Sequence, residues 1–68
     1  MKLSDLKLGQ KVSINGIPSE YQGIRKVEIP NFGKVEKRVF RRDENGECIY
    51  YNIIDGTKLL KNLGIKLL

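Results

Sequence analysis

The sequence predicts an all-β protein: a small five-stranded antiparallel barrel or half-barrel with one short helical turn near the C-terminus. Turn-forming residues recur at short, regular intervals, and the runs between them are rich in Val, Ile, Tyr and Phe. This pattern is typical of short strands in small β domains. In the last fourteen residues the pattern changes to leucines at helical spacing. The expected turns lie at residues 16–18, 30–33, 43–46 and 55–56.

The first two expected strands differ in regularity. In "GQKVSIN", residues 9–15, Val12 and Ile14 share one face and polar residues occupy the other. "SEYQGIRKVEI", residues 19–29, does not keep one parity, because Tyr21 and Val27 share a face while Ile24 falls on the other. Gly23 lies between them and predicts a bulge that resets the register.

The next two strands are expected to form a hairpin. "KVEKRVF" and "ECIYYNII", residues 34–40 and 47–54, flank a turn in which Asn45 and Gly46 offer the positive-φ pair of tight hairpins. Pro30 has no N–H to donate to a ladder, so the second strand should end before it. Strands two to four should therefore form an antiparallel meander.

The C-terminal segment predicts a helical turn over residues 56–63 and a brief closing strand. Leu59, Leu60 and Leu63 follow helical spacing, with Asp55 as the expected N-cap and Gly64 as the stop. So short a helix must be held by docking its leucines. "IKLL", residues 65–68, follows as the last strand.

This order of elements resembles the small barrels of the Src-homology-3 type, including the KOW and Tudor groups. "LGQKVSINGIPSEYQGIRKVEI", residues 8–29, is similar to a KOW opening: a Gly before a Val-x-Ile strand, then Gly16, then Gly23 before a hydrophobic-rich strand. It departs from that opening at "IPSEY", which is neutral to acidic where KOW segments are basic and glycine-rich. The resemblance implies a fold and says little about the ligand, because this barrel serves many unrelated functions.

With 68 residues, the chain is expected to form one domain, residues 1–68, with a small core. Its single cysteine excludes an internal disulfide, and it has no His and no Cys cluster to hold zinc. Cys48, in a strand-like run, is expected to be a small buried core residue of a cytoplasmic protein. No apolar run is long enough for a signal peptide or a membrane span, so no membrane contact is expected. The expected core is Leu6, Leu8, Val12, Ile14, Val27, Ile29, Val35, Val39, Ile53, Leu60 and Leu63.

The residue types argue against catalysis. Without His there is no imidazole base and no Ser-His or Cys-His pair. Asp43, Glu44 and Glu47 flank a turn, where acids are ordinarily solvated, and their spacing does not match a calcium loop. The glycines never form a phosphate-binding loop before a helix. We therefore expect a non-enzymatic protein with no cofactor and no metal.

The strongest functional signal is the basic third strand. Five cations and one acid lie between Lys34 and Arg42, in a chain of net charge +5. One face of this strand carries charged side chains together with one aromatic, and this pattern is typical of a sheet that contacts phosphates and stacks a base. Tyr50 is expected to point outward, with Ile49, Tyr51 and Ile53 inward. The candidate nucleic-acid-binding residues are Arg25, Lys26, Lys34, Lys37, Arg38, Phe40, Arg41, Arg42 and Tyr50.

Other interpretations stay open. The basic strand could be a solvated face that blocks edge pairing, and Phe40 could belong to the core. The partner could be RNA or DNA, or an acidic protein surface. A protein-interaction module, an adaptor or inhibitor, could instead use a sheet edge or the leucine-rich C-terminus. The chain could be a monomer or a weak homodimer, with Leu67 and Leu68 as the candidate contact.

Overall fold

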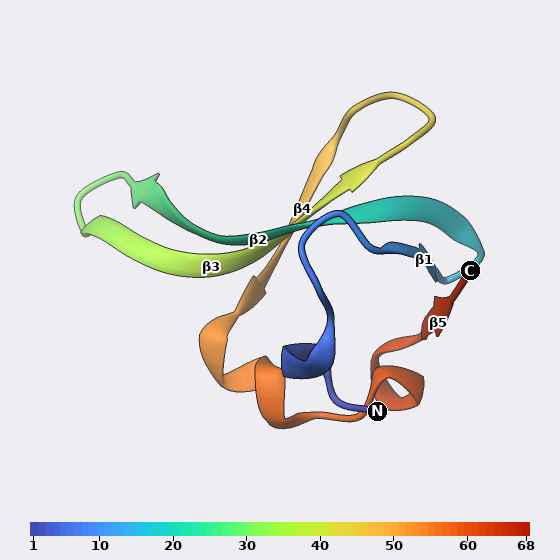
Figure 1. The fold of residues 1–68 in the computed structure, drawn as a ribbon. Helices are drawn as coiled ribbons and strands as arrows, with labels where there is room; N and C mark the ends of the chain where they lie inside the picture. The colour runs from blue at the N-terminus through green and yellow to red at the C-terminus, as the bar shows by residue number, and fades with distance from the viewer.

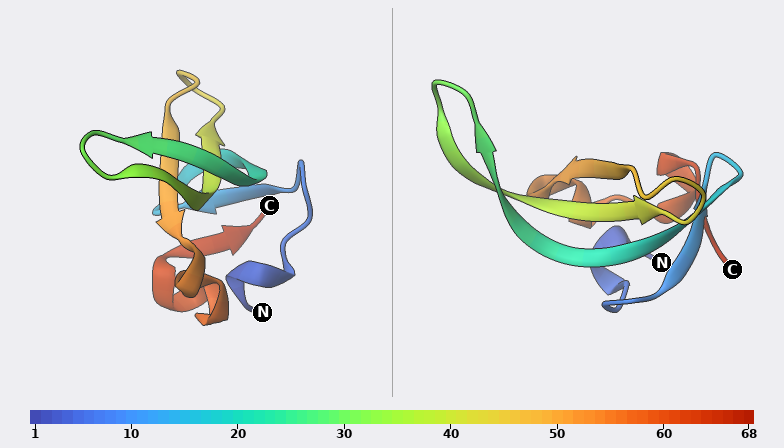
Figure 2. Two further views of the ribbon diagram at one scale, coloured as in Figure 1. Left: turned by 90° about the vertical axis from the view of Figure 1, so that its left-hand side faces the viewer. Right: turned by 90° about the horizontal axis from the view of Figure 1, so that it is seen from above.

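A computed structural model describes all residues from 1 to 68 and confirms the all-β class. One antiparallel sheet has the strand order β4-β3-β2-β1-β5 (Figure 1). Since β4 and β5 end that order, they are the two edges of the sheet, which is strongly bent (Figure 2). No helix has the length and apolar character needed to cross a bilayer. The strands are β1 (Lys11–Ile14), β2 (Ile17–Ile29), β3 (Gly33–Arg42), β4 (Cys48–Asn52) and β5 (Ile65–Leu67).

The tight positive-φ hairpin lies at a different turn from the one that the sequence predicts. Asn15 and Gly16, with φ of 50° and 86°, form a two-residue turn between the paired residues Ile14 and Ile17 of β1 and β2. In the longer loop between β3 and β4, only Gly46 has positive φ. The expected Asn45–Gly46 pair is therefore wrong. Asn45 instead accepts a hydrogen bond from the Glu47 N–H with its side-chain oxygen, at 2.9 Å.

The hairpin of β2 and β3 projects beyond the rest of the molecule (Figure 1). The register between these strands shifts between Tyr21 and Gly23, and Gly23 has φ of 84°, which confirms the expected bulge. β2 ends at Ile29, before Pro30, as expected. The far part of the hairpin lies outside the core, and Val27, Ile29 and Val35 are therefore half-buried rather than buried.

Two short 3-10 turns replace the single expected helical turn. They are η2 (Ile53–Thr57) and η3 (Leu60–Leu63), and a third, η1 (Leu3–Asp5), lies near the N-terminus. Lys58 and Leu59 between them are extended, because this segment pairs with the N-terminal one. The Leu3 N–H donates to the Lys58 carbonyl at 3.0 Å, and the Leu60 N–H donates to the Met1 carbonyl at 2.9 Å. These bonds satisfy backbone groups that a continuous helix would have paired internally.

The expected N-cap and stop of the C-terminal helical segment are confirmed only in part. Asp55 is the third residue of η2 rather than its N-cap, and its carboxylate accepts from the Asn52 N–H at 3.2 Å. Gly64, with φ of 71°, ends η3 as expected, in the left-handed conformation that glycine adopts without strain. β5 then pairs with β1, which confirms the closing strand.

The core lies on the inner side of the bent sheet, around Phe40. The Phe40 ring lies 5.0 Å from the Tyr21 ring and 5.5 Å from the Tyr51 ring, edge-on to the latter. Ile49, Tyr51 and Leu63 pack partly buried against this cluster, and Val39 is buried outside it. The buried cluster is Leu3, Leu6, Val12, Ile14, Tyr21, Phe40, Leu60 and Ile65.

Two residues expected in the core are exposed. Leu8 is 76% exposed because it lies at the corner of a turn in which the Gln10 N–H donates to the Lys7 carbonyl at 3.0 Å. Ile53 is 39% exposed because it is the first residue of η2, where the chain leaves the sheet. Helical or strand parity cannot place a side chain beyond the end of its element.

Candidate nucleic-acid interface

The two faces of β3 carry different side chains, as the period-two pattern predicts. Phe40 lies opposite Tyr21 and Ile49, on the inner face. Val39 lies opposite Gly23 and Tyr50, on the outer face. Because residues alternate along a strand, the expected basic patch is divided. Arg38 and Arg42 belong to the inner face, and Lys37 and Arg41 belong to the outer face.

On the inner face, two of the candidate residues contribute to the fold. Phe40 has no exposed surface, so of its two expected roles it has the core role and not the stacking role. Arg38 donates from Nη1 to the Tyr21 hydroxyl at 3.0 Å. Its guanidinium covers Gly56, where an added Cβ would lie only 2.7 Å from Nη2. Phe40 therefore cannot stack on a base, and Arg38 is anchored to the fold by the Tyr21 hydroxyl.

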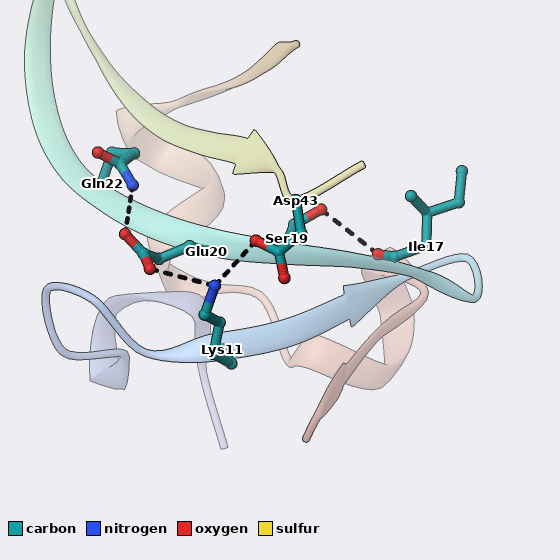
Figure 3. A network of polar contacts seen from close by, with 6 residues as sticks. All are labelled: Lys11, Ile17, Ser19, Glu20, Gln22 and Asp43. Carbon is teal, nitrogen blue, oxygen red and sulfur yellow. Dashed lines mark hydrogen bonds and ion pairs between the residues drawn. The ribbon is translucent and has the colours of Figure 1, made fainter. Parts of the chain in front are cut away.

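Arg42 is also engaged within the chain. Its Nη1 lies 3.3 Å from the Glu47 carboxylate, across the loop between β3 and β4. Lys11, at the start of β1, is held between two acids, Glu20 at 3.2 Å and Asp43 at 2.9 Å (Figure 3). This contact ties the loop to β1 and β2.

The pKa values of this polar cluster follow from its hydrogen bonds. Bonds from Lys11 to Asp43 and to Glu20 raise the pKa of the Lys11 ammonium above its usual value. The bond from Lys11, followed by one from Gln22 at 2.8 Å, lowers the pKa of the Glu20 carboxyl. The cluster is thus held in its charged form, with the charge of Lys11 neutralised by its neighbours. It offers no net positive surface to an anion.

A groove on the outer face brings four of the candidate residues together. It has a volume of about 420 Å³. Val39, only 3% exposed, belongs to its floor, and Tyr50, 51% exposed, stands at the β4 edge. The candidate residues among its lining are Arg25, Lys26, Arg41 and Tyr50, and the rest are Gln22, Val27, Val39 and Cys48.

Acids lie opposite two of the groove's cations in the β2–β3 ladder, Glu20 opposite Arg41 and Glu36 opposite Lys26, but form no direct ion pair with them. Arg25, Lys26 and Arg41 form no ion pair. Arg25 makes one long hydrogen bond, 3.4 Å, to the Gln22 side-chain oxygen, and Arg41 lies over the loop beside Gly46. Arg25 and Arg41, which form no ion pair, therefore flank one exposed aromatic ring, whereas Lys26 lies opposite Glu36 on the face of Arg38.

The remaining two candidates lie beside the groove. Lys34 and Lys26 line a second hollow, of about 520 Å³, together with Glu36 and Ile53. Lys37 donates from its ammonium to the Asn52 side-chain oxygen. Of these two, only Lys37 lengthens the positive surface of the outer face, because Lys34 shares the face of Arg38.

Sequence reasoning assigned the outer face of β4 only in part. The outward direction of Tyr50 is confirmed, as are the inward directions of Ile49 and Tyr51. The prediction that Cys48 is buried is wrong, because Cys48 pairs with Arg41 on the exposed face. Strand parity places Cys48 outside beside Tyr50, as the structure shows, whereas the apolar run around it had favoured a core position. Nothing in the sequence marks Gln22 and Val39 as residues of a binding groove.

Comparison with known proteins adds no relative. No protein-family model, no curated protein and no solved structure matches the chain. The resemblance to small barrels of the Src-homology-3 type therefore rests on the pattern of residues and elements alone.

Proposed function

We propose that this protein is a small non-catalytic module that binds nucleic acid, RNA or DNA, in the outer groove. The observation that carries the proposal is the exposed ring of Tyr50 beside Arg25 and Arg41, which form no ion pair. Cations that follow a phosphate backbone supply affinity. An aromatic ring beside them supplies a stacking surface for a base. The exposed Cys48 thiol fits the reducing environment of the cytoplasm.

The proposal favours single strands over duplexes. Only an unpaired base can turn its face onto an aromatic side chain, since the bases of a duplex are stacked on one another. The groove has one exposed aromatic ring, and no α-helix stands beside it to enter a major groove. A single strand of a few nucleotides fits this chemistry.

Fluorescence anisotropy with single-stranded and duplex oligonucleotides at two salt concentrations tests the proposal. Tyr50→Ala should weaken single-strand binding by the loss of one stacked base, about 1–3 kcal/mol, while Tyr50→Phe should retain most of the affinity. If wild type and Tyr50→Ala bind single strands equally well, the Tyr50 ring does not stack on a base.

The cations are tested by comparing charge removals inside and outside the groove. Arg25→Ala and Arg41→Ala should each weaken binding and reduce the salt slope by about 0.7 for a single strand. Lys66→Ala removes the same charge from the exposed strand β5, outside the groove, and is the matched control. If all three substitutions weaken binding equally, net charge rather than the groove carries the affinity.

An acidic protein surface is the second candidate, favoured by the open edge of β4 beside the same cations. An added strand would bind by main-chain hydrogen bonds. In that case single-stranded oligonucleotides should bind no better than duplexes. Poly-glutamate peptides should instead compete with the protein partner, and the Tyr50→Ala substitution should matter little.

A further inference from the structure

β4 is an edge strand without the usual protection against pairing. Its five residues, Cys48 to Asn52, include no charge, no proline and no bulge. Natural edge strands are commonly blunted by one of these devices, because their unpaired backbone groups otherwise recruit another strand. The opposite edge, β5, is only three residues long and carries Lys66 at its centre.

The register identifies which β4 backbone groups face outward. The Arg42 N–H donates to the Glu47 carbonyl at 2.8 Å, so these two residues form a hydrogen-bonded pair of the β3–β4 ladder. Because hydrogen-bonded pairs alternate in an antiparallel ladder, Ile49 and Tyr51 are the next residues that bond to β3. Cys48, Tyr50 and Asn52 then direct their N–H and C=O groups to the open edge. The Asn52 N–H agrees with this direction, since it bonds outside the ladder to the Asp55 carboxylate at 3.2 Å.

We propose that two copies of the chain form a two-fold dimer by antiparallel pairing of β4 with β4, centred on Tyr50. In this register Tyr50 exchanges both backbone hydrogen bonds with Tyr50 of the second copy. Cys48 lies opposite Asn52 of the second copy, and the Cys48 N–H donates to that residue's carbonyl. The Asn52 N–H keeps its bond to Asp55. A two-fold contact uses the same surface on both copies and closes on itself.

Charge complementarity favours a second copy as the occupant of this edge. Residue 47 of one copy lies opposite residue 53 of the other. The acidic residues Glu44 and Glu47 of the β3–β4 loop thereby approach the hollow that Ile53 lines with Lys26, Lys34 and Glu36, in which two cations face one acid. Glu44 forms no ion pair within its own chain, and neither do these two lysines. The contact is made twice, once on each side of the two-fold axis.

The dimer would also join the two outer grooves. Side chains of directly opposed residues share one face of a sheet, so the two Tyr50 rings would stand side by side between the two sets of cations. The pairing itself does not depend on nucleic-acid binding, and its test uses no nucleic acid.

Disulfide trapping tests the register. In Asn52→Cys, Cys48 and the new thiol would lie opposite each other across the dimer, with Cα atoms about 5.5 Å apart, within the range for a disulfide. They cannot bridge within one chain, because four residues along a strand span about 13 Å. Mild oxidation should convert most of the Asn52→Cys protein into a covalent dimer on non-reducing gels.

Two control proteins have thiols that do not lie opposite each other in this register. Wild type has Cys48 alone, about 13 Å from its copy in this register, and should stay uncrosslinked. Ile54→Cys adds an exposed thiol just beyond β4, opposite residue 46, and should crosslink far less than Asn52→Cys. Equal crosslinking of all three proteins, or none in Asn52→Cys, would overturn the proposed register.

Sedimentation of the unmodified chain completes the test. Wild type should show a concentration-dependent dimer, and Cys48→Lys, which places a charge on the edge strand, should be monomeric at the same concentrations. Circular dichroism should show that Cys48→Lys remains folded, because Cys48 is exposed. A dimer that persists in Cys48→Lys, or a wild type that is monomeric throughout, would overturn the proposal.

Discussion

The aromatic residues of this chain divide by burial into a structural set and a surface set. Phe40 is completely buried between two tyrosine rings, whereas Phe32, in the turn between β2 and β3, is 78% exposed. Tyr51 packs against the core, and its neighbour Tyr50 faces solvent. Adjacent residues of one strand thus serve the core and the proposed binding surface.

Phe40→Ala should unfold the protein or nearly so. Truncation of a buried phenylalanine costs about 3–5 kcal/mol, which is about all the stability that a core of this size supplies. Urea denaturation followed by circular dichroism measures the loss. Phe32→Ala removes the same atoms from an exposed site and should change stability by no more than about 0.5 kcal/mol. Similar losses in both variants would contradict the position of the core.

Tyr51 should make the fold sensitive to alkali. Burial, followed by the nearby Asp55 carboxylate, raises the pKa of the Tyr51 phenol above its ordinary value of 10.0. The unfolded chain then releases this proton at lower pH than the folded one. The stabilisation linked to the raised pKa of Tyr51 is fully present at pH values below the pKa of the phenol in the unfolded chain. It is lost as the pH rises through the pKa of the phenol in the folded chain.

The midpoint of alkaline unfolding measures this effect. Tyr51→Phe should flatten the decline of stability above the unfolded pKa, because its ring stays buried without a titrating group. Tyr50→Phe is the matched control, since Tyr50 is exposed, and it should follow wild type. A Tyr51→Phe curve parallel to wild type would mean that other groups govern alkaline unfolding.

The sequence predicted the direction of a side chain correctly where the parity of a single strand was enough. It placed Tyr50 outward and Tyr51 inward, and both directions are confirmed. It could not tell which cations of β3 bond to other groups of the fold, because those groups lie far away in the chain. The Tyr21 hydroxyl that receives Arg38 and the glycine that it covers, Gly56, lie 17 and 18 residues from it in sequence.

Among the elements, the strands were predicted better than the segments between them. The bulge at Gly23 and the end of β2 before Pro30 follow from local chemistry, since one residue tolerates positive φ and the other lacks an N–H. The break between η2 and η3 does not follow from local chemistry. It arises from pairing of Lys58 to Leu60 with the N-terminal residues, a contact across most of the chain.

Two consecutive leucines test the structure of this C-terminal segment. Leu60 is buried in the core cluster, whereas Leu59 is exposed at the extended break between the two turns. Leu60→Ala should cost about 2–5 kcal/mol, and Leu59→Ala should cost much less. Thermal melting of both variants distinguishes them. A larger loss for Leu59→Ala would show that the segment docks by its other face.

At the scale of the whole molecule, the net charge of +5 is unevenly compensated. Ion pairs collect around β1 and the β3–β4 loop, where Lys11 and Arg42 meet acids. On the outer face of β2, β3 and β4, Arg25 and Arg41 lie beside Tyr50 and form no ion pair. Composition predicts the amount of excess charge, but the bend and register of the sheet determine where it is free.

Chemical-shift mapping by NMR, during titration of the folded protein with a short single-stranded oligonucleotide at low salt, tests the central claim most directly. The proposal predicts the largest shifts at the amides of Arg25, Val39, Arg41 and Tyr50 and at the Tyr50 ring, with little change around Lys11 and Asp43. Shifts spread evenly over all exposed lysines, or confined to the C-terminal leucines, would contradict binding in the outer groove.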